Sequence, residues 1–109
     1  MRKYIAANYD KIRTWRRNGD LKKHFGISLD QYNEMLEAQG FVCAICNLPE
    51  TQKCSTTGVV YKLAVDHCHK TGKVRALLCS RCNRTLGMVD DDVLLLQKLS
   101  AYIQQFTGA

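Results

Sequence analysis

The chain has 109 residues and a net charge of +6, with 16 Lys and Arg against 10 Asp and Glu. A chain of this length forms one domain (residues 1–109) with a small core, so a metal or disulfide staple is expected. No segment is long and apolar enough for a transmembrane helix, and the polar N-terminus does not resemble a signal peptide. These features exclude a membrane protein and favour a cytoplasmic one.

The positive charge is concentrated in a basic N-terminal arm, residues 1–23, which holds eight basic and two acidic side chains. Its apolar residues recur every three or four positions, which predicts an amphipathic helix ending near Asn18 and Gly19. Such an arm binds nucleic acid by releasing counterions, although a solvated helix face explains the charge equally well. Trp15 could stack on a base, but an aromatic residue at helical spacing is more often core. The nucleic-acid contacts predicted in the arm are Arg13, Arg16 and Arg17.

A second helix is marked at both ends. Ser28 is a candidate N-cap, with Gln31 at the capping-box position, and Gly40 supplies the C-terminal stop. The apolar stripe between them, which we interpret as packing, consists of Leu29, Tyr32, Met35 and Leu36.

Two Cys-x-x-Cys pairs follow, Cys43 with Cys46 and Cys79 with Cys82. Each turn directs two thiolates at one point, so the two turns together supply the four sulfurs of a tetrahedral structural Zn²⁺ site. Disulfides are the alternative, but without a secretion signal such pairs more often bind metal. The two remaining cysteines are interpreted as free thiols and not as ligands: Cys54 and Cys68.

The segment between the two pairs predicts a loop and a hairpin. Residues 47–58 are rich in turn-forming side chains, and residues 59–65 are β-branched and aromatic, which predicts a strand ending at Asp66 and His67. After a turn, residues 74–78 form the returning strand.

Two helices are expected after the second cysteine pair. The first covers residues 83–86 and is interrupted by Gly87. The last begins after the acidic residues 90–92, whose charge suits a helix N-terminus. Its predicted buried face consists of Leu95, Leu99, Tyr102 or Ile103, and Phe106.

Three polar residues can converge when the hairpin folds against the following helix: Asp66, His67 and Asn83. Carboxylate and amide oxygens are ligands that Mg²⁺ prefers, and an imidazole can take a proton from water near neutral pH. Simpler explanations exist for each residue. Asn83 can cap the helix, and Asp66 can pair with Arg75. His67 or His69 can replace a cysteine at the zinc.

Three motifs occur together: Cys43-x-x-Cys46, then Val65-Asp66-His67-Cys68-His69, then the run from Thr71 to Leu78 that leads into Cys79-x-x-Cys82-Asn83. In them the chain resembles the phage recombination endonuclease VII family, which belongs to the His-Asn-His, or ββα-metal (His-Me finger), nucleases. The resemblance implies an α+β fold, with a zinc-stapled ββα-metal core at residues 41–92 between N- and C-terminal helices. Ala76 stands where many relatives have glycine.

The resemblance also implies roles for individual residues. Structural Zn²⁺ would be held by the four cysteines, and catalytic Mg²⁺ or Mn²⁺ by Asp66 and Asn83. His67 would be the general base, and His69 would assist at the phosphate. Further nucleic-acid contacts are predicted at the basic residues around this core, Lys73, Arg75, Arg81 and Arg84.

The sequence thus predicts a metal-dependent DNA endonuclease of nicking or junction-resolving type. We expect it to be encoded by a phage or prophage and to act in the bacterial cytoplasm, and a homodimer on DNA is compatible with this function. The alternative is a non-catalytic, zinc-dependent DNA-binding module that uses the basic arm. A zinc-mediated protein-interaction domain is a third hypothesis.

Overall fold

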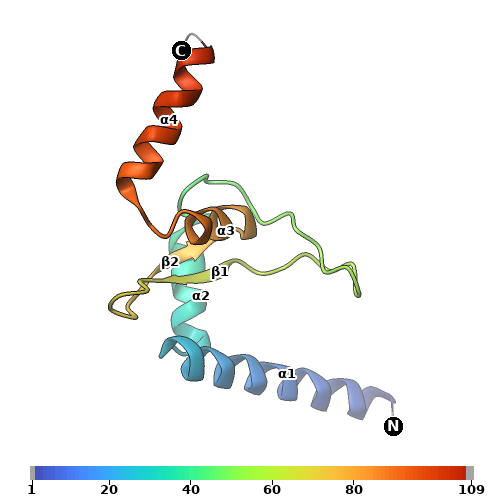
Figure 1. The fold of residues 1–109 in the computed structure, drawn as a ribbon. Coiled ribbons are helices and arrows are strands. Elements are labelled where there is room, and N and C mark those ends of the chain that lie inside the picture. The colour runs from blue at the N-terminus through green and yellow to red at the C-terminus, as the bar shows by residue number, and fades with distance from the viewer. Residues whose placement is uncertain (1, 108–109) are drawn as a thin grey trace.

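The computed structural model describes the backbone of residues 2–107 and the side chains of residues 14–107. This part of the chain has four helices and a two-stranded antiparallel sheet, which confirms the α+β class. The β-hairpin lies at the centre near α2 and α3, while α1 and α4 extend away from it (Figure 1). In chain order the elements are α1 (Arg2–Phe25), α2 (Leu29–Ala38), β1 (Ala64–His67), β2 (Val74–Leu78), α3 (Ser80–Met88) and α4 (Val93–Thr107).

Helix α2 begins and ends as the sequence predicts. The Gln31 backbone N–H donates to the Ser28 hydroxyl at 3.1 Å, and the Ser28 N–H donates to the Gln31 side-chain oxygen at 2.7 Å. The other end closes in a Schellman turn through Gly40, whose φ is 69°. Backbone groups at both ends of the helix therefore have hydrogen-bond partners close by in the sequence. The predicted apolar stripe packs on the core through the buried Tyr32.

The central hairpin agrees with the prediction on one strand and differs on the other. Strand β2 has the predicted bounds, whereas β1 is shorter than predicted because residues 59–63 are not part of it. Ala64 lies opposite Leu78, the last residue of β2, so the residues before Ala64 have no partner strand in this sheet. The register is irregular between Val65 and His67.

Helix α1 does not end near Gly19 as predicted but continues to Phe25. Beyond the glycine, Leu21 is fully buried. Glycine costs a helix about 1 kcal/mol relative to alanine, while burying a leucine side chain stabilises by about 1.5–3 kcal/mol, so packing decides. Asn18 joins two helices instead of ending one, because its side-chain oxygen accepts the Leu29 N–H at 2.9 Å.

Helix α3 is also longer than the predicted range of 83–86. It begins at Ser80 because Cys79 is its N-cap: the Cys79 sulfur accepts a hydrogen bond from the Cys82 N–H. Gly87 does not interrupt the helix, which continues to Met88.

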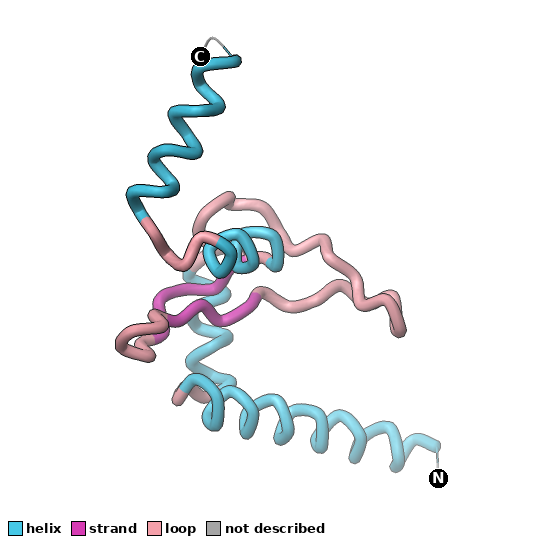
Figure 2. The backbone as a smooth tube through the Cα atoms, viewed as in Figure 1, coloured by secondary structure: helices cyan, strands magenta, loops and turns pink. Residues whose placement is uncertain are grey.

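Helix α4 begins where predicted, but its buried face is a wrong prediction. Asp92 accepts the Leu95 N–H at 3.0 Å and so caps the first turn. None of the helix is buried, and Leu99 is 45% and Phe106 is 75% exposed. Trp15, for which a core position was favoured, is 80% exposed on α1. The radius of gyration, 17.6 Å, exceeds the roughly 13 Å of a compact chain of this length because both terminal helices project (Figure 2).

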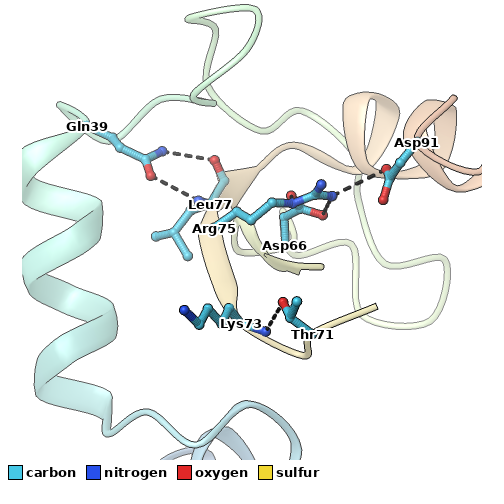
Figure 3. A network of polar contacts seen from close by, with 7 residues as sticks. All are labelled: Gln39, Asp66, Thr71, Lys73, Arg75, Leu77 and Asp91. Atoms are coloured by element: carbon cyan, nitrogen blue, oxygen red, sulfur yellow. Dashed lines mark hydrogen bonds and ion pairs between the residues drawn. The ribbon is translucent and has the colours of Figure 1, made fainter. Parts of the chain in front are cut away.

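The core lies where α1, α2, the hairpin and the first cysteine turn meet. Tyr32 donates a hydrogen bond to the Leu63 carbonyl at 2.6 Å, which fixes α2 to the segment entering β1. The Gln39 amide accepts the Leu77 N–H and donates to its carbonyl, both at 2.9 Å, so it continues the hydrogen bonding of β2 (Figure 3). The buried residues are Leu21, Tyr32, Cys43, Leu63, Val65, Asp66, Leu77, Leu78 and Cys79.

None of the helices within residues 2–107 is both long enough and apolar enough to cross a membrane.

Candidate functional site

The four cysteines of the two Cys-x-x-Cys pairs, hereafter the cysteine cluster, meet at one point. Their sulfur atoms all lie within 4.8 Å of one another, and the sulfurs of Cys46 and Cys79 are 3.9 Å apart. Four thiolates around one Zn²⁺ at about 2.3 Å are separated by about 3.8 Å, so the cluster fits this ion. Among the described residues, the group that could hold a metal contains no histidine. The alternative of a histidine at the zinc is therefore not supported.

Each half of the cluster is built by a short local motif. In the first, the Asn47 N–H donates to the Cys43 carbonyl and the Cys43 N–H donates to the Leu48 carbonyl, with Asn47 in the left-handed region at φ 59°. In the second, Cys79 is both a ligand candidate and the N-cap of α3. The positions of the sulfurs are thus fixed by backbone geometry close to each cysteine.

The two remaining cysteines lie in turns of the same design as the first cysteine turn. The carbonyls of Cys54 and Cys68 each accept the N–H of a glycine four residues later, Gly58 at φ 72° and Gly72 at φ 74°, and each cysteine N–H donates to the carbonyl five residues later. A threonine stands where the first turn has its second cysteine. These turns therefore carry one sulfur each, and neither joins the cluster.

The thiols of the cluster are mutually dependent. Burial raises the pKa of Cys43, but the backbone N–H donors around it outweigh burial and lower this pKa to about 6. Burial, and then hydrogen bonding to the neighbouring sulfurs, raises the pKa of Cys82 to about 12. Four adjacent thiolates therefore do not form at neutral pH without a compensating charge. A divalent cation would supply that charge.

On the side of α3 away from the cysteine cluster lies an open cleft of about 930 Å³, between the end of α1, strand β1 and α3. The four predicted catalytic residues all line it: Asp66, His67, His69 and Asn83. Carboxylate and amide oxygens thus face the same space as two imidazoles, which is the donor chemistry that a hard divalent cation and a phosphate require.

Asp66 is the buried charged group of this cleft, with 8% of its surface exposed. Both of its oxygens are held by Arg75: Nε lies 2.6 Å from Oδ2, and Nη2 lies 3.0 Å from Oδ1 (Figure 3). The simpler explanation for Asp66, an ion pair with Arg75, is therefore realised. The pKa of Arg75 is raised by the hydrogen bond to Asp66 and then by that to Asp91, so the guanidinium stays charged.

The histidines form an aromatic row at the cleft. The ring centroids of His67 and His69 are 5.0 Å apart, and that of Phe25 lies 5.7 Å from His67. Phe25 thus gives His67 an apolar neighbour from α1. Asn83 is not the N-cap of α3, because that position belongs to Cys79. The simpler explanation for Asn83, capping of the helix, is therefore not supported.

The predicted nucleic-acid contacts do not all reach the cleft. Arg17 lines it, with its guanidinium 4.9 Å from the centroid of the Tyr32 ring. Arg16 is exposed on α1, whereas the side chain of Arg13 lies outside the described residues. Arg81 and Arg84 line a second groove of about 640 Å³ beside the cysteine cluster.

Sequence reasoning missed partners that are distant along the chain. Glu50 in the long loop accepts the Ser80 N–H at 2.6 Å and the Ser80 hydroxyl at 3.0 Å, which ties this loop to the start of α3. Thr14 and Tyr61 also line the cleft. Nothing local marks these residues, because the elements that they meet lie far along the sequence.

Comparisons with known proteins place the chain in a family. The family model for recombination endonuclease VII matches residues 18–105. The chain is similar to the Gene 59 protein of Mycobacterium phage L5, at 39% identity over 80 residues that cover 72% of this chain and 44% of the relative. It is also similar to the Gene 59 protein of Mycobacterium phage D29, at 38% identity over 82 residues that cover 74% and 46%. The chain therefore spans less than half of these relatives. No solved structure matches it.

Proposed function

The chain belongs to the recombination endonuclease VII family, and on that basis we propose that it is a phage- or prophage-encoded DNA endonuclease acting in the host cytoplasm. Its residues 41–92 would be a ββα-metal core that hydrolyses phosphodiester bonds. The observation that carries the proposal is the shared cleft of Asp66, His67, His69 and Asn83, on the side of α3 opposite the cysteine cluster.

In the proposed reaction, His67 accepts a proton from a water molecule. The water oxygen then bonds to the scissile phosphorus while the bond from phosphorus to the leaving oxygen breaks. His69, whose ring lies 5.0 Å from that of His67, contacts the phosphate and helps orient the base. The Asp66 carboxylate and the Asn83 amide oxygen would hold Mg²⁺ or Mn²⁺. When bound there, the ion would stabilise negative charge on the phosphate and on the leaving oxygen.

The DNA would lie along α1, whose sequence is rich in basic residues, and would enter the cleft near the C-terminal end of that helix. Arg17 supports this path, because it comes from the arm and lines the cleft. Arg16 is exposed earlier on the same helix. Basic side chains on a helix contact phosphates without reading bases, so this interaction is expected to be independent of sequence and sensitive to salt.

The cysteine cluster would be a structural site. With Zn²⁺ bound, it would hold the first cysteine turn against the start of α3, and α3 carries Asn83. A structural metal of this kind contributes to folding and does not require an open coordination position.

The test is cleavage of supercoiled plasmid with Mg²⁺, with Mn²⁺ and with a chelator. We expect His67→Ala to lose turnover by about 10²-fold or more while keeping zinc and the wild-type melting temperature. The matched control is His24→Ala, because His24 is exposed on α1 and does not line the cleft. Equal losses in both variants would contradict the role of His67.

A second candidate function is a non-catalytic, zinc-dependent DNA-binding module. The observation that favours it is the occupation of both Asp66 oxygens by Arg75. A wild-type protein that binds DNA but leaves plasmid intact with either ion across a range of pH would establish this function instead.

A further inference from the structure

The side chain that holds Asp66 comes from outside the cleft. Asp66 lines the cleft, whereas Arg75 does not. The two residues face each other at the irregular part of the hairpin, where the register shifts between Val65 and His67. This local irregularity gives Asp66 a guanidinium on one side and the cleft on the other.

Arg75 is itself held by a third residue. Its Nη2 lies 3.3 Å from Oδ1 of Asp91, in the segment between α3 and α4, where Asp90 and Asp91 have φ of 53° and 56°. Figure 3 shows the Arg75 side chain reaching from β2 to the carboxylate of Asp66, with a dashed line from its guanidinium to Asp91. Arg75 therefore connects the strand that carries Asp66 to the chain that leaves α3.

A two-point contact fixes the orientation of a carboxylate but does not use all of its hydrogen-bond acceptor sites. An ionised carboxylate has about four lone-pair sites, and the Arg75 fork uses one on each oxygen. The remaining sites stay available to a ligand in the cleft. A metal-binding carboxylate commonly has a hydrogen-bonding partner of this kind, which sets its orientation.

We propose that Arg75, supported by Asp91, is a positioning residue that holds the Asp66 carboxylate for a divalent cation in the cleft. This inference rests on the proposed function, and it assigns the Arg75 guanidinium to the protein and not to a DNA phosphate. The predicted DNA contact at Arg75 is the rival role. The two roles differ in the quantity that they change, which is metal affinity in one case and DNA affinity in the other.

The decisive measurement is Mn²⁺ binding to zinc-loaded protein without DNA, followed by the electron paramagnetic resonance signal of free Mn²⁺. Loss of a partner of this kind typically weakens metal binding by about 10- to 100-fold. We expect Arg75→Met and Arg75→Lys to show a weakening in this range, because lysine cannot form the fork. Asp66→Ala should abolish the site, and Asp91→Asn should weaken it by a few fold.

The matched control is Lys98→Met, because Lys98 is an exposed basic residue of α4 that lines neither the cleft nor the second groove. Zinc content and melting curves show whether each variant is folded. If Arg75→Met does not fold, Asp91→Asn tests the proposal, because it loses only the support of Arg75.

Wild-type Mn²⁺ affinity in the folded Arg75 variants, or a higher affinity, would overturn the inference. A weaker affinity for DNA in chelator, with Mn²⁺ binding unchanged, would assign Arg75 to the phosphate instead. A wild type without an Mn²⁺ site that depends on Asp66 also overturns it. If Mn²⁺ binding weakens as expected but the wild type does not cleave plasmid, the positioning role stands and the proposed function fails.

Discussion

The cysteine cluster and the cleft lie on different sides of one short helix, and they are built in different ways. Cys79 and Cys82 belong to the groove beside the cluster, while the adjacent Asn83 lines the cleft. The cluster is closed, with four sulfurs within 4.8 Å of one another. The cleft is open and takes its side chains from α1, β1 and α3. The proposed structural role of the cluster and the proposed catalytic role of the cleft can therefore be tested separately, although the two sites share α3.

The largest expected effect comes from breaking the cluster. Cys79→Ser removes a sulfur but leaves a hydroxyl that can still cap α3. We expect the protein to lose zinc and most of its fold, because metal binding and folding are coupled in such sites. Metal analysis and circular dichroism are the measurements. Cys54→Ser is the control, since Cys54 lies in a similar turn but outside the cluster. Unchanged zinc stoichiometry and melting in Cys79→Ser would refute the four-cysteine site.

A smaller effect is expected when only the proposed DNA path to the cleft is changed. Charge reversal at Arg13 and Arg16 should weaken binding to all DNA sequences alike. It should also flatten the plot of log K against log salt by about 0.9 for each phosphate that the arm no longer neutralises. Arg17 is left unchanged because its guanidinium packs over the Tyr32 ring.

The control for this experiment reverses two lysines outside the arm, Lys53 and Lys98, and so alters the net charge equally. If both double variants keep the wild-type salt slope, the arm is not the DNA-binding surface. If both change it equally, only net charge matters. Zinc content should be the same in all of these proteins.

The smallest expected effect concerns the core that supports both sites. Tyr32→Phe removes the hydrogen bond to the Leu63 carbonyl and leaves that buried group without its donor. We expect a decrease of about 1–3 kcal/mol in the free energy of unfolding, with zinc still bound. Chemical denaturation of the zinc-loaded protein measures it, and Tyr102→Phe on exposed α4 is the control. Equal stabilities of the two variants would contradict the importance of this bond.

The features that the sequence predicted best depend on neighbouring residues. The capping box of Ser28 and Gln31 and the bounds of β2 were predicted because their signals are local. The predicted end of α1 at Gly19 was wrong, because packing of Leu21 outweighs the small helix cost of a glycine. Helix α3 was predicted to be interrupted at Gly87 but continues to the exposed Met88. The predicted buried face of α4 was wrong because an apolar stripe does not identify its own partner.

The same division holds for the candidate site. The sequence by itself determined which four cysteines cluster, because each Cys-x-x-Cys turn sets the direction of its own side chains. The tertiary structure decided that Asp66 is held by Arg75 and Arg75 by Asp91, partners nine and sixteen residues apart that meet only through the hairpin and the end of α3. It also decided which residues of α3 face the cysteine cluster and which line the cleft. Successive helical residues differ by about 100° in direction, so Cys82 and the adjacent Asn83 contribute to different sites.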